Sequence, residues 1–455
     1  MAVKSIVKAS ELEGAKRLDA EYYQPKYICS EEEIRSCPFQ VSTLMTLLKP
    51  IKNGFDYRNF SEEGRPYIRV GDLLFGQVVY REAEKIEVSE AEIRKDVKLK
   101  VGDVLFSRKG TFGRSAVVEE AFVEAIISSE VMLLRLKDPS QINPYYLSAF
   151  LNSKYGFYQV ERRTHGVSNF SISQRDVGEL KIPIAPPSFQ NNIAEIISKT
   201  YREFENSYAL YLQAEQILLE ELGWDKVALS QPQSYSISLG QAKDVSRVDA
   251  EHFQPKYDRL LDYIKSVGKT DLLGDVVLFN KRGLQPTYAK EGNVIVVNSQ
   301  HLGRYLLNVE ATERTDEDFW RNNKRCQLKM NDVLVYSTGA YVGRTNVWLE
   351  DSKAIASNHV NIIRPGKEYT PLYLAAYLNS LPGLWQAEMW ASGSGQRELY
   401  PEDIARFVLY RAPQEIQEKI ANLILQSYQA RKKAKALLEE AKRKVEEAIE
   451  EAAGR

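Results

Sequence analysis

The chain has 455 residues, of which 44% are hydrophobic and 27% charged, and its formal net charge is -1 at pH 7. This composition excludes a chain dominated by disorder or collagen-like repeats, and the length indicates roughly three packing units of about 150 residues. The near-zero net charge excludes a bulk positive field, so any contact with nucleic acid must come from local basic patches.

The N-terminal stretch MAVKSIVKASELEGAKRL lacks the apolar core of a secretory signal, and no later stretch approaches the roughly 18 apolar residues that span a bilayer. The cysteines, Cys29, Cys37 and Cys326, show neither the spacing of a zinc site nor a disulfide pattern. We therefore expect a cytoplasmic protein that is neither exported nor inserted in a membrane.

An internal duplication is the main feature of the chain. RLDAEYYQPKY at residues 17–27 returns as RVDAEHFQPKY at residues 247–257. Four more pairs follow in order: VGDVLFSRKGTFGR with MNDVLVYSTGAYVGR, AIISSEVMLLR with AIASNHVNIIR, NPYYLSAFLNSKYG with TPLYLAAYLNSLPG, and PPSFQNNIAEII with APQEIQEKIANLI. Between these anchors, as after Lys52 and Lys281, the copies diverge. One scaffold with two different recognition surfaces is predicted.

Each half begins with strands and continues with helices. The runs at 102–106 and 331–335 are short, apolar and opened by turn residues, which predicts strands. Asn-Pro at 143–144 and Thr-Pro at 370–371 each place a capping residue before Pro, which predicts the start of a helix.

A long amphipathic helix closes each half. The first has a stripe at coiled-coil spacing that only Glu215 interrupts, formed by Ile197, Tyr201, Phe204, Tyr208, Tyr211, Glu215, Leu218 and Leu222. The second has a stripe of smaller side chains, formed by Ile416, Ile420, Leu423, Ala430, Ala434, Leu437, Ala441, Val445 and Ala448. An isolated helix of this kind usually packs on its own domain. The duplication instead favours an antiparallel pair about a pseudo-twofold axis, about 50 Å long at about 1.5 Å per residue.

The predicted fold class is α/β (mixed α+β), with two similar globular domains joined by two long antiparallel helices that form a coiled-coil spacer. The predicted limits are 1–185 for the first domain, 186–223 for the first long helix, 224–411 for the second domain and 412–455 for the second long helix. Such a spacer could set two domains on separate turns of a DNA duplex, which repeats its face about every 34 Å.

Signatures of catalysis are missing from the sequence. It has no GxxxxGK[ST] loop for phosphates, and Asn143-Pro144-Tyr145-Tyr146 lacks the second proline of an adenine methyltransferase motif. The four histidines lack metal-ligand spacing. Asp103 and Asp332 recur before a strand, where a turn-forming role is favoured over acid/base chemistry. We predict no catalytic residues and no metal site.

Basic loops with Gly, Ser, Thr and aromatic residues are the candidate DNA contacts, because cations fix phosphates while side-chain forks and amides read base edges. In the first half the candidates are Lys52, Arg58, Arg108, Lys109, Thr111, Arg114, Arg162, Arg163, His165, Ser168 and Asn169. In the second half they are Lys281, Arg282, Gln285, Asn298, Gln300, His301, Arg304, Thr338, Tyr341, Arg344, Ser394, Gln396 and Arg397. Any single one of them can equally be a solvated surface charge.

The R-[LV]-D-A-E line, the GDVLF-type strand with its Gly-Arg turn, the YLxAxLNS helix and the Pro-Pro or Ala-Pro boundary into a long helix occur together. With them, the chain resembles the specificity (S) subunit of Type I restriction-modification enzymes over essentially its whole length. Gly166 to Ile172 and Gly393 to Leu399 also look like that family. Val167 and Asn169 depart from its usual Gly-Ser/Thr-x-Gln, which leaves the contacts of that loop open.

The resemblance implies a non-catalytic subunit in which each recognition domain reads one half of a split double-stranded DNA target. The helices would act as spacer and ruler. Two modification (methyltransferase) subunits are expected to dock on the conserved regions and to bring S-adenosylmethionine. Restriction subunits, with ATP and Mg, would complete the nuclease. No cofactor is expected on this chain.

Two other classes remain open from the residues alone. One is a two-domain protein-interaction adaptor dimerised through its helices, which the near-neutral charge suits. The other is a degenerate enzyme with an unrecognised cofactor motif, which is disfavoured because the duplication repeats no catalytic set. Salt separates DNA binding from the adaptor, since cation-mediated DNA contact weakens steeply with ionic strength.

Overall fold

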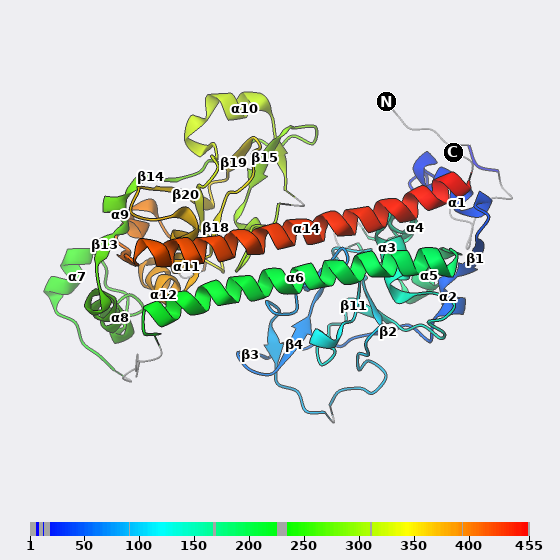
Figure 1. The fold of residues 1–455 in the computed structure, drawn as a ribbon, viewed down its shortest axis with the longest axis horizontal. Coiled ribbons are helices and arrows are strands. Elements are labelled where there is room, and N and C mark those ends of the chain that lie inside the picture. The colour runs from blue at the N-terminus through cyan, green and yellow to red at the C-terminus, as the bar shows by residue number, and fades with distance from the viewer. Residues whose placement is uncertain are drawn as a thin grey trace. The chain divides into compact units, whose positions relative to one another are not determined.

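The computed structural model describes residues 6–8, 12, 19–90, 92–166, 170–224, 234–309, 312–393 and 395–453. The chain forms two compact units: unit 1 is residues 1–204 with 432–455, and unit 2 is residues 205–431. Each is a mixed α/β structure, as predicted (Figure 1). The finer domain limits given above stay a prediction.

The described part of unit 1 contains two four-stranded sheets, one of them antiparallel throughout, together with two two-stranded sheets and several short helices. Its helices are α1 (Pro25–Ser36), α2 (Leu44–Leu47), α3 (Pro144–Asn152), α4 (Lys154–Arg163), α5 (Gln174–Gly178) and the first part of α6 (Pro187–Glu221). Its strands are β1 (Gln40–Thr43), β2 (Lys52–Asn53), β3 (Phe60–Ser61), β4 (Arg65–Ile68), β5 (Leu73–Leu74), β6 (Gln77–Val78), β7 (Lys85–Ile86), β8 (Val104–Ser107), β9 (Ser115–Val117), β10 (Ile126–Ile127), β11 (Val131–Leu134) and β12 (Lys181–Ile184).

Unit 2 is built from a corresponding set of elements. Its helices are α7 (Leu239–Val245), α8 (Pro255–Val267), α9 (Leu273–Val276), α10 (Glu317–Asn322), α11 (Pro371–Asn379), α12 (Leu381–Trp390), α13 (Pro401–Ile404) and the first part of α14 (Gln414–Ala452). Its strands are β13 (Thr270–Leu272), β14 (Val277–Arg282), β15 (Val294–Val297), β16 (Arg314–Thr315), β17 (Val333–Tyr336), β18 (Thr345–Val347), β19 (Ala354–Ala356), β20 (Val360–Pro365) and β21 (Val408–Tyr410).

One four-stranded sheet and two strand pairs recur in both units. The order β2-β11-β8-β9 in unit 1 matches β14-β20-β17-β18 in unit 2, with every neighbouring pair antiparallel. The parallel pair β4 and β10 matches the parallel pair β15 and β19, and β1 with β12 matches β13 with β21. The sequence repeat is therefore also a repeat of topology within each unit.

Asp103 and Asp332, which directly precede β8 and β17, each hold an arginine and a turn of their own unit. In unit 1, Arg135 donates from Nε to Asp103 Oδ1 (2.7 Å) and from Nη2 to Oδ2 (2.6 Å). In unit 2, Arg364 donates to Asp332 in the same way, at 2.7 and 3.0 Å. Each carboxylate also accepts from a backbone N–H three residues earlier, at 2.8 Å. This geometry agrees with a turn-forming role.

The predicted helix starts are confirmed. Pro144 and Pro371 open α3 and α11, and the residue before each is the N-cap. Asn143 Oδ1 accepts from Tyr145 N at 3.0 Å, and Thr370 Oγ1 accepts from Tyr373 N at 3.3 Å. Each cap satisfies a backbone donor that the first helical turn leaves open.

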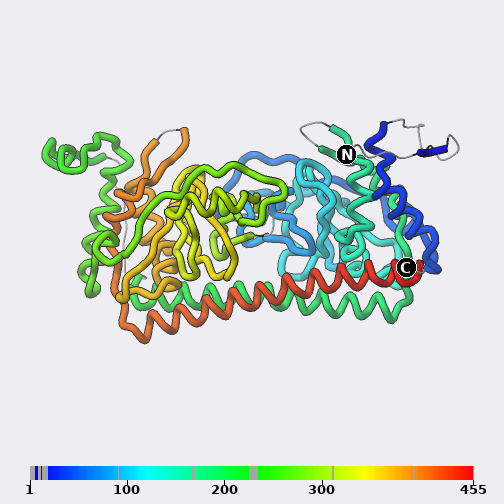
Figure 2. Tube along the Cα trace, turned by 90° about the horizontal axis from the view of Figure 1, so that it is seen from above, coloured from blue at the N-terminus to red at the C-terminus, as the bar shows by residue number. Residues whose placement is uncertain are grey.

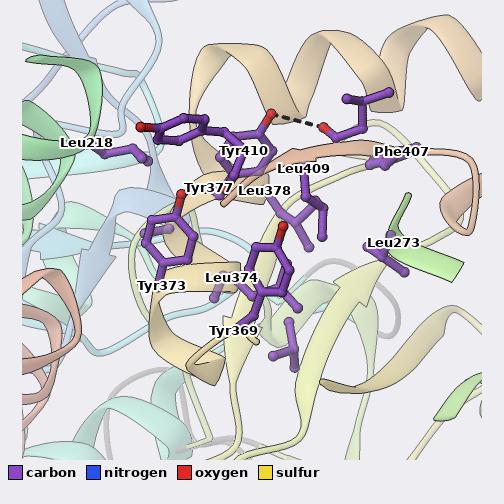
Figure 3. Close-up of a cluster of buried hydrophobic side chains, with 14 of the residues drawn as sticks. Leu218, Leu273, Tyr369, Tyr373, Leu374, Tyr377, Leu378, Phe407, Leu409 and Tyr410 are labelled. Carbon is purple, nitrogen blue, oxygen red and sulfur yellow. Dashed lines mark hydrogen bonds between the residues drawn. The ribbon is translucent and has the colours of Figure 1, made fainter. Parts of the chain in front are cut away.

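The main core of unit 2 lies between α11, α12 and strand β21. Figure 3 shows the rings of Tyr369, Tyr373, Tyr377 and Tyr410 among the leucines of this cluster. Buried hydroxyls need partners, and here Tyr373 donates to the carbonyl of Tyr410 at 2.8 Å and Tyr377 to that of Val408 at 2.9 Å. These bonds fix α11 against β21.

The long helices contribute to both units. Within unit 1, Lys433 pairs with Glu203 at 2.5 Å, and Ile193 and Ile197 share the core with Val445. This pairing shows that α6 and the last part of α14 run antiparallel there (Figure 2). Within unit 2, Ser427 Oγ donates to the carbonyl of Ser207 at 2.6 Å. No helix in the described ranges is long and apolar enough to cross a membrane.

Candidate nucleic-acid interface

Each unit joins two loops edge to edge. In unit 1 these are loop A1 (107–114) and loop B1 (164–172), and in unit 2 loop A2 (337–344) and loop B2 (391–399). Gly110 N donates to Phe170 O at 2.9 Å, and Ile172 N donates to Arg108 O at 3.0 Å. In unit 2, Gly339 N donates to Arg397 O and Leu399 N to Ser337 O, both at 2.9 Å. The duplicated sequence thus builds the same loop pair twice.

Loops A1 and A2 turn on the glycine before their shared arginine. Gly113 has φ of 80° and Gly343 has φ of 96°, a left-handed conformation that residues with a Cβ rarely adopt. Gly113 N donates to Ser107 O at 3.1 Å, and Gly343 N donates to Tyr336 O at 2.9 Å. The predicted Gly-Arg turn therefore closes a hairpin between β8 and β9 and between β17 and β18.

The exposed candidates of unit 1 gather on its loop pair. Lys109, Thr111 and His165 are exposed there, and Arg58 is exposed on the segment after β2. The side chain of His165 is 56% exposed, and its Nε2 lies 3.6 Å from Asp176 Oδ2. The loop pair itself therefore offers the ammonium of Lys109, the hydroxyl of Thr111 and the imidazole of His165 to a ligand.

Three further cations of unit 1 have protein partners. Arg108 donates from Nη1 to Ser129 O at 3.5 Å, and its Nε is buried without a hydrogen bond. Arg114 donates from Nη1 to Leu73 O at 3.3 Å and lies over the Phe75 ring. Lys52 pairs with Asp96 at 3.1 Å. Each side chain remains partly exposed, so each stays a candidate.

In unit 2 an aromatic residue lies at the tip of loop A2. Tyr341 is 45% exposed, and the guanidinium of Arg344 lies 3.7 Å from its ring centroid. Gln396 and Arg397 are exposed on loop B2. Together they present a stacked aromatic and cation beside an amide and a second guanidinium, a set that can contact both phosphates and base edges.

The other exposed candidates of unit 2 lie outside its loop pair. Lys281 and Gln285 are exposed near the end of β14, and Arg304 is exposed over the ring of Tyr305. Asn298 and Gln300 are held by one carboxylate, since their side-chain amides donate to Glu313 at 2.8 and 3.1 Å.

Four predicted contacts are wrong because the side chains are buried. Arg162 and Arg163 are 5% and 4% exposed and pair with Glu31. His301 is 5% exposed, and its Nδ1 accepts from Asn298 N at 2.9 Å. Thr338 is 4% exposed and accepts from Arg282. Each of these side chains is turned into its own unit and held by contacts within that unit.

Sequence analysis missed Phe170, which is 43% exposed on loop B1. Its ring packs edge to face on Phe112 at 5.9 Å, and Phe112 stacks on Phe157. The available signal was its place in the repeated motif before α5. Ser168, Asn169 and Ser394 lie outside the described residues.

The side chains on the loop pairs suit binding of an anionic ligand. Within the described ranges no group of three or more His, Cys, Asp or Glu residues could hold a metal ion. The loop pairs carry cations, amides, hydroxyls and aromatic rings. Such groups can bind an anionic polymer and read the edges of its bases.

Comparison with known proteins gives two sequence matches. Residues 40–215 match the family model of the Type I restriction modification DNA specificity domain. The "Putative type I restriction enzyme MjaX specificity subunit" of Methanocaldococcus jannaschii is 28% identical over 175 residues. That alignment covers 37% of this chain and 40% of the relative, less than half of either. The predicted resemblance to type I specificity subunits is confirmed.

Solved structures of type I systems align along most of the chain with low TM-scores. The S subunit from M. genitalium gives a TM-score of 0.38 and 14% identity, covering 91% of this chain and 96% of that one. The HsdS subunit from Thermoanaerobacter tengcongensis gives 0.28 and 17%, covering 91% and 96%.

Proposed function

We propose that the chain is a non-catalytic DNA-recognition subunit, because residues 40–215 match the family model of the Type I restriction modification DNA specificity domain. Each unit reads one half of a bipartite target in double-stranded DNA. Methylation of adenine belongs to two modification subunits that bring S-adenosylmethionine. DNA cleavage belongs to restriction subunits that use ATP and Mg.

The observation that carries this proposal is the repeated loop pair with different side chains. The backbone bonds that join A1 to B1 recur between A2 and B2, whereas Lys109 of one pair corresponds to Thr338 of the other. The family match contains A1 and B1 and ends before A2 and B2. The role of unit 2 is therefore inferred from the duplication. Two half-sites of different sequence require different side chains, and here such side chains are presented on the same backbone arrangement.

The long helices supply the proposed spacing between half-sites. α6 and α14 are 35 and 39 residues long and each contributes to both units. A helix of this length spans about 50 Å at about 1.5 Å per residue, more than one turn of duplex DNA. The modification subunits dock on the repeated framework, which is where the two halves agree in sequence.

The test is to co-express the chain with a modification subunit from the same source and to map methylated adenines in the host DNA. A motif of two short defined elements separated by a fixed undefined gap is expected. If the complex assembles and binds S-adenosylmethionine but leaves no new methylation, DNA recognition by this chain is refuted.

Modularity has its own test. Exchanging residues 52–165 for the corresponding segment of another family member is expected to change one half-site and to leave the other intact. A change in both elements of the methylated motif would contradict separate reading by the two units.

Direct contact is tested on loops A2 and A1, at Arg344 and Arg108. Arg344→Ala is expected to weaken binding to the half-site of unit 2 about tenfold, and Arg108→Ala that of unit 1. If Arg344 contacts phosphate, its loss lowers the slope of affinity against salt by about 1. Unaltered binding in both variants would mean that Arg108 and Arg344 belong to the structural framework and do not contact DNA. Affinity insensitive to salt in the wild type would favour a protein-interaction adaptor.

A further inference from the structure

Arg282 differs from the other cations near the candidate interface because its side chain is turned into unit 2. It ends strand β14, and its side chain is 23% exposed. The backbone beside it is tightly held: Gly283 N donates to Val360 O at 3.0 Å, and a Cβ on Gly283 would lie 2.2 Å from Ala356 O. The guanidinium therefore projects from a fixed point.

The guanidinium contacts both loops of the pair at once. From Nη2 it faces the hydroxyl of Thr338 at 3.2 Å and the carbonyl of Ser337 at 3.4 Å, both in loop A2. The same nitrogen lies 3.4 Å from the carbonyl of Leu399 in loop B2. Its Nη1 lies 3.8 Å from Glu398 Oε2, also in B2. One side chain thus bridges the two loops where their backbones already meet.

Glu398 of loop B2 and Tyr400, directly after that loop, hold the guanidinium in this position. The ring of Tyr400 lies 4.8 Å from it, within cation–π range, and the Tyr400 hydroxyl donates to Glu398. Arg282, Glu398 and Tyr400 therefore form a closed set of a cation, an anion and an aromatic ring. A guanidinium presents its donors in a fixed planar fork, whereas the three donors of a lysine ammonium radiate from a single nitrogen.

Unit 1 has short side chains at the same three positions. The backbone bond of Gly283 recurs at Gly54, whose N donates to Val131 O, so Asn53 corresponds to Arg282. Asn53 Oδ1 accepts from Gln174 Nε2 at 3.0 Å. The repeat places Ser171 and Ser173 opposite Glu398 and Tyr400. The three positions change together between the units, as expected for residues that act as one set.

We infer that Arg282 is a positioning residue that fixes loops A2 and B2 relative to each other, and through them the exposed side chains that read the half-site of unit 2. This inference rests on the proposed function. It differs from the sequence-based expectation that Arg282 itself touches DNA. A positioning residue affects every base pair that the two loops read, because both loops shift when it is lost.

Arg282→Gln separates three roles by three readouts on the full chain in its complex with modification subunits. Competition with single-mismatch DNA duplexes measures discrimination at each base pair, and titration against salt measures phosphate contacts. For a positioning residue, discrimination is expected to fall about tenfold at every position of the half-site of unit 2. The half-site of unit 1 and the salt slope are expected to stay unchanged.

Each other pattern overturns the inference. A salt slope lower by about 1 would make Arg282 a phosphate contact, and lost discrimination at a single base pair would make it a base reader. Full discrimination in Arg282→Gln would mean that the backbone bonds alone set the loops. If the wild type shows no sequence preference, the proposed function fails, a result that is distinct from all of these.

Two further variants guard against a general folding defect. Arg282→Lys keeps the charge but loses the planar donor set, so it is expected to relax discrimination nearly as much as Arg282→Gln at an unchanged unfolding midpoint. Lys265→Gln removes an exposed charge from α8 of the same unit and serves as the matched control. If Arg282→Lys still discriminates fully between matched and mismatched DNA, only the positive charge of Arg282 matters and its planar donor set does not.

Discussion

The joint between α1, α4 and β12 in unit 1 is built with ions, whereas the same joint in unit 2 is built with apolar side chains. Glu31 is buried in unit 1 and lies 2.8 Å from Arg162, 3.5 Å from Arg163 and 3.1 Å from Lys181. Arg162 also stacks on the ring of Tyr22 at 4.0 Å. One carboxylate thus holds three cations inside the unit.

The repeat places Leu261, Met389, Trp390 and Val408 at these four positions in unit 2. The last three are 7 to 8% exposed and belong to the apolar core of the unit, and Leu261 packs against that core. The surrounding backbone is joined identically. Gln159 exchanges two hydrogen bonds with the backbone of Lys181 at 3.0 and 2.8 Å, and Gln386 does the same with Val408 at 3.0 and 2.6 Å.

This difference indicates that packing of the two helices and the strand depends more on the backbone hydrogen bonds and on filling the space between them than on the charges. A buried ion set is stable only while every member is present, because an unpaired buried charge is costly. An apolar set of similar volume avoids that dependence. A single substitution in unit 1 can therefore leave a buried charge unpaired, a cost that does not arise at the corresponding positions of unit 2.

Removing the central carboxylate is the most damaging change that we predict. Glu31→Gln leaves two guanidiniums buried without a counter-charge, and it is expected to lower the free energy of unfolding of unit 1 by about 3–5 kcal/mol. Denaturant unfolding of the full chain measures this, with Glu32→Gln on the exposed side of the same helix as control. A loss below about 1 kcal/mol would show that the cations do not depend on Glu31.

Acid should weaken the ionic joint selectively. Burial by itself raises the pKa of Glu31, but the charges of Lys181, Arg162 and Arg163 outweigh it and hold the pKa at about 2, below the ordinary 4.5. Because the folded value is the lower one, the stabilisation is fully present above about pH 4.5 and is lost as the pH falls toward 2. The expected loss is about 3 kcal/mol, from 1.36 kcal/mol per pKa unit.

The reference for this titration is a variant that carries the apolar residues of unit 2 at the four positions: Glu31→Leu, Arg162→Met, Arg163→Trp and Lys181→Val. Stability measured between pH 5 and about 2 should fall more steeply in the wild type than in this variant. Parallel curves would mean that Glu31 titrates alike in the folded and unfolded chain.

The ion pairs that both units share should respond equally. Asp103→Asn and Asp332→Asn each remove a bidentate partner of a half-buried arginine, and each is expected to lower the free energy of unfolding by about 2 kcal/mol. The two values should agree within about 0.5 kcal/mol, because the bonds are the same in both units. Unequal losses would reveal a difference in the surrounding turns, which the repeated hydrogen bonds do not predict.

The smallest effect is expected for the complete apolar replacement itself at neutral pH. The four-residue variant should unfold within about 1–2 kcal/mol of the wild type, since well-packed apolar residues can replace a buried ion set at little cost. A loss comparable to that of Glu31→Gln would show that the pocket around α4 of unit 1 does not fit the side chains that unit 2 uses.

Much of the fold could be predicted from the chain alone. The proline-capped helices start where the Asn-Pro and Thr-Pro pairs stand, because a cap and a fixed φ are local effects. Strands β8 and β17 lie where the apolar runs after Gly102 and Asn331 were found. The repeat of these signals in the same order predicts two units of one topology.

The candidate contacts were less predictable. Lys109, Thr111, Tyr341, Gln396 and Arg397 are exposed on the loop pairs as expected. The Arg-Arg pair before His165 looks equally basic and equally polar in sequence, yet it is buried. Nothing within a few residues of the pair reveals Glu31, which lies about 130 positions earlier in the chain.

The sequence by itself therefore determined the duplication, the starts of the proline-capped helices and the family resemblance, because caps, turns, periodicity and repeats are encoded in neighbouring residues. It did not give the order of elements, since α1 and α8 precede the strands of their units, where strands were expected first. Only the tertiary structure decided which cations face outward. Arg282, Arg162 and Lys109 are all basic residues near a strand or loop, and they differ in what distant segments bring beside them. A cation is turned inward where the fold places a carboxylate or carbonyl from a distant part of the chain beside it. Such a contact is set by the tertiary structure and not by the neighbouring residues.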